Sequence, residues 1–157
     1  MTDRLAGADG GADPANTIVV GVDGSDASIA ATRWAAAEAA LSGRRVVLLS
    51  AWQFPISWGT TIPLPDGYDP AADARSVLDP VTDALRAAFP SVEIRNRVVE
   101  GHPAEVLVEA SRHAALLVVA NRGHGAFAGM LLGSVSQHCV SHAHSPVLVY
   151  RTSSPGG

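Results

Sequence analysis

The fold of this chain is decided by one stretch of sequence, Thr17-Ile18-Val19-Val20-Gly21-Val22-Asp23-Gly24-Ser25-Asp26. Its first six residues form an apolar, mostly β-branched run, which is typical of a strand buried on both faces of a parallel sheet. The last four residues carry the turn and capping side chains that begin a helix. A buried strand that leads directly into a helix indicates an α/β fold.

The alternation of strand and helix continues along the chain. Apolar periodicity predicts helices over 28–41 and 72–89, a third helix that begins at Pro103, and a short helix over 134–143. Further strands are predicted over 46–51, 93–99, 116–120 and 146–150. Pro80 is expected to disturb the second helix, and the segment 52–69, rich in proline and glycine, is expected to be a long loop. Together these elements predict a parallel sheet.

Length and composition predict one globular domain. The chain has 157 residues, of which 47% are hydrophobic. A chain of this size buries a core large enough to be stable without disulfides or a structural metal. The expected domain covers residues 16–151, with disordered tails over 1–15 and 152–157. The first tail lacks the basic and apolar regions of a secretory signal, so a cytoplasmic protein is the default expectation.

Charge and residue usage exclude several classes of protein. Charged residues are 17% of the chain and the net charge is −4, which argues against a protein that binds nucleic acid through a basic surface. No apolar run approaches the 18 residues of a membrane span. One cysteine excludes a disulfide framework, and Cys139 is expected to pack as a small apolar residue. All eleven basic residues are arginine, which excludes chemistry that needs a lysine.

A glycine-rich segment over 121–133 lies between a predicted buried strand and a predicted helix. Ligands of α/β sheets bind beyond the carboxyl ends of the strands. Gly123 can adopt positive φ, and the pair Gly133-Ser134 opens a helix whose free amides attract an anion. The Ser134 hydroxyl can meet a phosphate oxygen or a bound metal ion. The alternative is an ordinary glycine loop in which Ser134 is the N-cap.

The sequence resembles the universal stress protein family over nearly all of residues 16–151. The resemblance rests on Val20 to Ser25, the strand ends 49–52 and 99–104, the segment 123–135, and Ser145 to Val149. The ATP-binding branch of that family has the motif G-x2-G-x9-G-[ST]. This chain keeps Gly123, the nine-residue gap, Gly133 and Ser134, but Ala120 replaces the first glycine of the motif.

The resemblance implies a fold and an assembly. The fold is a single-domain, five-stranded parallel sheet in the order 3-2-1-4-5 with helices on both faces, which is Rossmann-like and similar to adenine nucleotide alpha hydrolases. The family is normally dimeric through the last strand. Because Val147 to Tyr150 is apolar and lies near the chain end, we expect it at a sheet edge, pairing with a second copy in a homodimer.

The resemblance also implies a nucleotide site at the switch point between the first and fourth strands. The ribose is expected near Asp23 and Ala120, and the adenine near Gly21 and the backbone of Ala51. The phosphates are expected at Gly123, Gly133, Ser134 and Val135, bordered by Asn121 and Arg122. The site is completed by Val22, Val119 and Ser136. In the alternative interpretation, Asp23 is a buried carboxylate that only caps the first helix.

The resulting hypothesis is a cytoplasmic stress-response regulator that binds ATP, AMP or cAMP and acts as a nucleotide-dependent dimeric switch. No residue stands out as a general base, so no catalytic residue is assigned, and any Mg²⁺ is expected to be held through the phosphates and Ser134. Two alternatives stay open, which are a dimeric scaffold of the same fold without nucleotide, favoured by Ala120, and a weak ATPase.

His138 and His142 have a spacing that can hold zinc, but a solvent-facing helix surface is favoured.

Overall fold

The computed structural model describes residues 13–54, 56–57, 59–121 and 132–152. A 3-10 turn over Pro14–Asn16 precedes the first strand. The strands are β1 Thr17–Gly21, β2 Arg45–Trp52, β3 Ile56–Ser57, β4 Thr60–Thr61, β5 Ile94–Glu100, β6 Leu116–Ala120 and β7 Val147–Tyr150. The helices are α1 Asp26–Ser42, α2 Pro70–Ala88, α3 Pro103–Ser111 and α4 Ser134–His142. The predicted tails fall largely on residues 1–12 and 153–157, which lie outside the described residues.

Five of the strands form one parallel sheet in the order β5-β2-β1-β6-β7. Since β5, β6 and β7 are the third, fourth and fifth strands of this sheet along the chain, the predicted order 3-2-1-4-5 is confirmed. At the centre, Val19 of β1 is in register with Val47 of β2 and Leu117 of β6. The sheet therefore has β5 and β7 at its two edges.

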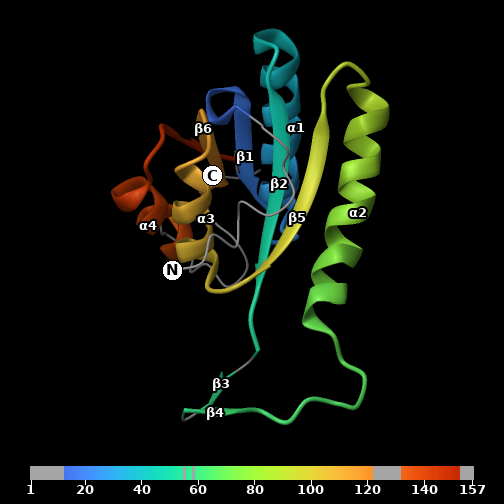
Figure 1. Ribbon diagram of the computed structural model, residues 1–157, viewed down its shortest axis with the longest axis vertical. Helices are drawn as coiled ribbons and strands as arrows, with labels where there is room; N and C mark the ends of the chain where they lie inside the picture. The colour runs from blue at the N-terminus through green and yellow to red at the C-terminus, as the bar shows by residue number, and fades with distance from the viewer. Residues whose placement is uncertain (1–12, 55, 58, 122–131, 153–157) are drawn as a thin grey trace.

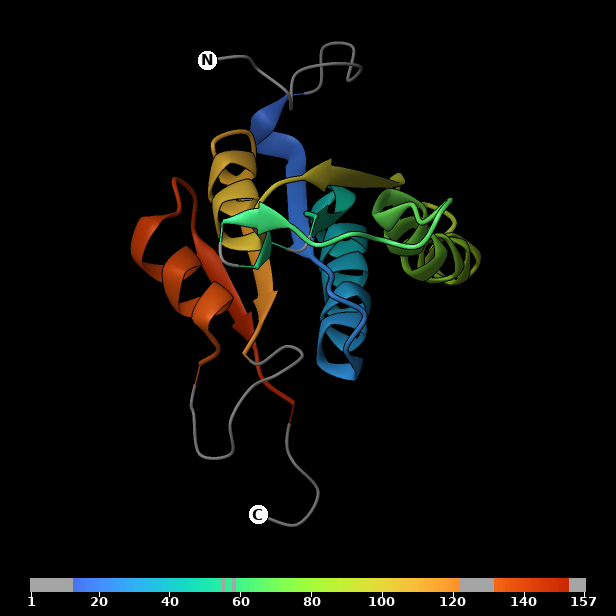
Figure 2. The same ribbon diagram turned by 90° about the horizontal axis from the view of Figure 1, so that it is seen from below.

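Helices cover both faces of this sheet, as predicted (Figures 1 and 2). Successive side chains of a strand point to opposite faces, so each buried strand supplies two cores. One core contains Ile18, Val20 and Leu48 against the alanines of α1 and Leu78 and Leu85 of α2. The other contains Val19, Leu49 and Val119 against Val106 and Leu107 of α3 and Cys139 of α4.

Two local expectations are wrong. Helix α2 continues through Pro80 as one element, because Leu78 and Leu85 on either side of the proline are buried in the same core while Pro80 itself is exposed. The segment 52–69 is also not entirely irregular, since Ile56 and Ser57 pair with Thr61 and Thr60 in an antiparallel hairpin. Strands of two residues are too short to leave a periodic pattern in the sequence. In Figure 1 this hairpin lies apart from the sheet, beyond the end of β2.

None of the helices in the described part of the chain has the length and apolarity needed to span a lipid bilayer.

Candidate functional site

The candidate site is defined by the neighbouring strands β1 and β6. After β1 the chain enters α1 on one face of the sheet, and α4, which follows β6, lies on the opposite face. This divergence is the switch-point arrangement at which open α/β sheets bind ligands. The structure therefore brings together three of the predicted segments, which are the end of β1, the end of β6 and the start of α4.

At the end of β1, Asp23 supports the first turn of α1. Asp23 Oδ1 accepts hydrogen bonds from the Ser25 amide at 2.9 Å and the Ser25 hydroxyl at 2.5 Å. The Ser25 hydroxyl oxygen in turn accepts from the Ser28 amide at 3.2 Å, which makes Ser25 the N-cap of α1. Asp23 is exposed rather than buried, so the buried-cap alternative is wrong, and its role is to orient the residue that caps the helix. The sequence predicted turn and capping chemistry over Asp23 to Asp26 without deciding which residue is the cap, and it placed Ser28 only as the first residue of the helix.

Gly21 is explained by packing. A Cβ placed on Gly21 would lie 2.9 Å from Cδ1 and 3.2 Å from Cδ2 of Leu107, which is buried on α3. The missing side chain therefore lets α3 approach the sheet closely. A contact between Gly21 and a nucleotide stays a prediction, but a substitution there would first test the packing of α3.

Two of the three valines predicted at this site, Val22 and Val119, present only their backbone. Val22 and Val119 are buried, and their side chains belong to the cores on opposite faces of the sheet. The Val22 amide continues the sheet by donating to the Leu49 carbonyl at 2.9 Å. Ala51 lies in β2 with its side chain packed against the core under α3. Any nucleotide contact at Val22 or Val119 has to come from main-chain groups.

The end of β6 is tied to the start of α4 through Asn121. This residue is 5% exposed, and its amide donates to the Tyr150 carbonyl at 2.9 Å. Its own carbonyl accepts from the Gly133 amide at 2.6 Å and from the Ser136 hydroxyl at 3.2 Å. The buried Ser136 hydroxyl also contacts the Gly133 carbonyl at 3.0 Å. Asn121 and Ser136 therefore position α4, and a direct ligand contact from either residue stays a prediction.

The start of α4 has the features of an anion site. Gly133 is the N-cap residue and makes no side-chain capping bond, whereas Ser25, Asp69 and His102 cap α1, α2 and α3 with their side chains. Ser134 is the first residue of the helix, so the alternative interpretation in which Ser134 is the N-cap is wrong. The amides of the first helical turn have no acceptor within the helix, and with the helix dipole they attract an anion.

Ala120 occupies ordinary extended backbone as the last residue of β6, in register with Tyr150. The alanine in place of the motif glycine is therefore unstrained. Arg122 and Gly123, which were predicted to border and bind the phosphates, lie outside the described residues.

The histidine pair on α4 shows no sign of a metal centre. The imidazoles of His138 and His142 stack with their centroids 4.3 Å apart, and His142 Nδ1 lies 3.1 Å from the His138 carbonyl oxygen. Across the described residues, no group of three or more His, Cys, Asp or Glu side chains is placed to hold a metal ion.

Cys139, which lies between the two histidines in sequence, is fully buried, and burial raises the pKa of its thiol to about 11. The thiol is therefore protonated at neutral pH and packs as a small apolar group, as predicted.

Comparisons with known proteins agree with this geometry. The model of the universal stress protein family matches residues 14–151. Universal stress protein Rv2623 from Mycobacterium tuberculosis (strain ATCC 25618 / H37Rv) is 38% identical over 143 residues, which are 87% of this chain and 45% of that protein. The chain spans about half the length of the curated relatives it matches.

Solved structures show the same likeness. A universal stress protein crystallised in complex with cAMP is 34% identical, with a TM-score of 0.66, and the match covers 88% of this chain and 98% of that one. Universal stress protein UspA from Lactobacillus plantarum has a TM-score of 0.74 at 21% identity, and the match covers 87% of this chain and 97% of that one. The second likeness supports the fold alone.

Proposed function

Since this chain belongs to the universal stress protein family, we propose that it is a cytoplasmic stress-response regulator that binds ATP or a related adenine nucleotide, AMP or cAMP. The observation that carries this proposal is the uncapped amino terminus of α4, held beside the end of β6 by the Asn121 carbonyl. The relative solved in complex with cAMP supports an adenine nucleotide as the ligand class.

The phosphates would be bound mainly by backbone amides. Gly133 has φ −72° and ψ 168°, which any residue adopts, so backbone conformation does not require a glycine there. Close approach of another group to the main chain is the other physical reason for a glycine. Because the chain contains no lysine, the phosphate charge would be balanced by these amides, by Arg122 and by Mg²⁺, with the exposed Ser134 hydroxyl available to the ion.

The nucleoside would extend from the phosphates toward β1 and β2. Asp23 is exposed at the end of β1, where a carboxylate can accept hydrogen bonds from ribose hydroxyls. The adenine would lie against the main chain of Gly21 and Ala51, beyond the carboxyl ends of both strands. In this arrangement β1 binds the sugar, and α4 binds the phosphates.

Nucleotide binding would regulate a homodimer in which the β7 strands of two copies pair. The amides of Leu117 and Asn121 donate to the carbonyls of Pro146 and Tyr150, so these even-numbered residues face β6. The backbone groups of Val147 and Val149 consequently point away from the sheet, where a second copy can bind them. Because Tyr150 also contacts Asn121 through its carbonyl, the dimer edge and the phosphate site share a residue pair, which gives nucleotide binding a route to the interface.

A dimeric scaffold that binds no nucleotide is the second candidate, and Ala120 is the observation that favours it. A weak ATPase is the third possibility, and release of phosphate above a protein-free blank would support it. Identifying any ligand released from the denatured, purified protein by mass spectrometry separates the first two candidates.

The phosphate site is tested by Gly133→Val. The backbone at Gly133 suits valine, so we expect a folded protein that binds ATP and cAMP at least tenfold more weakly, because the side chain occupies the approach to the α4 amides. Calorimetric titration with and without Mg²⁺ measures the change, and circular dichroism checks the fold. Ala88→Val, at an exposed position at the end of α2, is the control. Wild-type affinity in folded Gly133→Val would contradict the phosphate assignment.

A further inference from the structure

The two edges of the sheet, β5 and β7, are built differently. We propose that Arg86 closes the β5 edge to strand addition, so that this protein can extend its sheet only at β7. An open edge strand presents a row of backbone donors and acceptors with which another chain can pair. The inference therefore concerns which surface of the molecule is available to a second copy of the chain.

The direction of the backbone groups in β5 follows from its bonds to β2. The Val46 amide donates to the Glu93 carbonyl at 2.9 Å, and the Gly101 amide donates to the Trp52 carbonyl at 2.8 Å. Odd-numbered residues along this strand thus face β2. Because successive backbone groups in a strand alternate in direction, the carbonyl of Ile94 points outward from the sheet.

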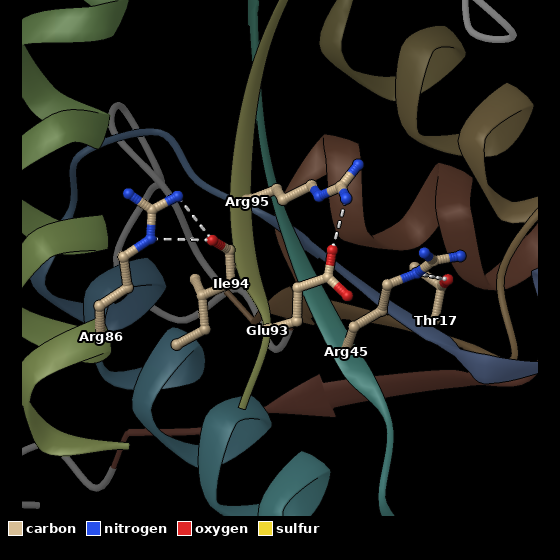
Figure 3. Close-up of polar contacts among 6 residues, drawn as sticks. All are labelled: Thr17, Arg45, Arg86, Glu93, Ile94 and Arg95. Carbon is tan, nitrogen blue, oxygen red and sulfur yellow. Dashed lines mark hydrogen bonds and ion pairs between the residues drawn. The ribbon is translucent and has the colours of Figure 1, made fainter. Parts of the chain in front are cut away.

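Arg86 occupies that outward carbonyl. Its Nε and Nη2 atoms donate to the Ile94 oxygen at 2.9 Å and 2.7 Å, as Figure 3 shows. A carbonyl oxygen has two lone pairs, so this double contact leaves the oxygen poorly able to accept from an incoming strand. Figure 3 shows the Arg86 guanidinium beside the edge of β5 at Ile94. Leu85, the preceding residue of α2, is buried in the core and holds this end of the helix in place.

Charged side chains at the β5 edge also disfavour the pairing of a second strand with it. Glu93, the residue before β5, forms an ion pair at 2.6 Å with Arg95, seen in Figure 3, and Arg97 follows two residues later in the strand. Charges on an edge strand discourage a second strand from pairing with it. β7, by contrast, reads Val-Leu-Val-Tyr and carries no charge. The two edges therefore differ both in their backbone acceptors and in their side chains.

The difference limits how far copies of the chain can assemble. If both edges were open, pairing at β7 followed by pairing at β5 would produce an open-ended row of copies. With β5 closed, pairing at β7 ends with two copies. That consequence rests on the proposed homodimer, whereas the closure of β5 by Arg86 does not.

The test compares Arg86→Ala with Arg75→Ala. Arg75 lies at an exposed position of the same helix, so the control removes the same charge without touching β5. Light scattering over a range of protein concentrations measures the mass of each variant. We expect the mean mass of Arg86→Ala to rise with concentration to at least twice that of the control. Equal masses at every concentration, with both variants folded by circular dichroism, would overturn the proposal.

Further variants separate this proposal from the β7 homodimer. With β7 blocked by Val149→Pro, adding Arg86→Ala should still raise the mass from one copy to two, because only the β5 edge is then available. A monomeric wild type together with self-associating Arg86→Ala would refute the homodimer and leave the closure of β5 standing. If Arg86→Ala does not fold, Arg86→Lys replaces it, since lysine keeps the charge but cannot donate in the same forked geometry. A folded Arg86→Lys protein with the mass of the control would then overturn the proposal.

Discussion

At the scale of single residues, two glycines that both lie in the candidate site have different physical explanations. Gly21 leaves room for Leu107 of α3, whose Cδ1 would lie 2.9 Å from a Cβ at this position. Gly133 has a backbone conformation open to any residue, so its glycine points to a group that approaches the main chain. Of the two glycines, only Gly133 can therefore be substituted to test ligand binding without disturbing the packing of α3.

Ala120 is the residue at which this chain departs from the nucleotide-binding motif. Its extended backbone in β6 carries no strain, so the alanine affects binding only through contact of its methyl group with the ligand. We expect Ala120→Gly to tighten nucleotide binding by up to about tenfold, equivalent to about 1.4 kcal/mol. Calorimetric titration of both proteins measures the change.

The same substitution should lower the free energy of unfolding by roughly 0.5–1 kcal/mol, because glycine loses more backbone entropy in a strand. A gain in affinity alongside a loss in stability would separate binding from a general effect on the fold. If neither protein bound an adenine nucleotide at millimolar concentration, the scaffold would replace the nucleotide-binding proposal.

At the scale of elements, the amino termini of the helices divide into capped and uncapped ones. The first turn of α1 is closed by Ser25, whose hydroxyl is held by Asp23. The first turn of α4 follows Gly133 and has no side-chain cap. Among the described residues, α1 therefore has a side-chain cap at its N-cap position, whereas α4 has none.

The cap on α1 makes a prediction about stability. Ser25→Ala removes the acceptor for the Ser28 amide, so the free energy of unfolding should fall by about 1 kcal/mol. Denaturant unfolding measures it, with Ser76→Ala on the exposed side of α2 expected to stay within about 0.5 kcal/mol of wild type. The substitution should also weaken nucleotide binding, because Asp23 loses the hydroxyl partner that orients its carboxylate. Equal stability of the Ser25 and Ser76 variants would show that the cap contributes nothing.

At the scale of the whole molecule, the proposed dimer depends on the outward-facing side of β7. Val149→Pro removes an amide that faces away from β6, so the monomer should keep its fold while pairing with a second copy is lost. Light scattering should then show half the wild-type mass. Leu148→Pro is the matched control, since the amide of Leu148 faces β6 and its loss should unfold the protein. An unchanged dimer mass in folded Val149→Pro would place the interface elsewhere.

Strands and helices were predictable because their signals are local. The buried runs at Thr17 to Val22 and 116–120, and the apolar periodicity of the helices, lie within single elements and predicted each one to within a few residues. The strand order, by contrast, came from the resemblance to a family rather than from the pattern itself. The hairpin of β3 and β4 left no signal, since two residues make no period.

Local patterns in the sequence were enough to predict an α/β protein without lysine, in which a glycine-serine pair opens the last helix. Three features became visible only in the folded chain, which are the packing of Leu107 against Gly21, the capping of α1 by Ser25 rather than Asp23, and the bonds of Arg86 to the edge of β5. The Ser25 cap and the Arg86 contact are close in sequence but depend on the exact path of the backbone, whereas the Gly21 contact joins distant parts of the chain. Leu107 lies far from Gly21 in sequence, and the packing of α3 on the sheet, which no local pattern encodes, brings the two into contact.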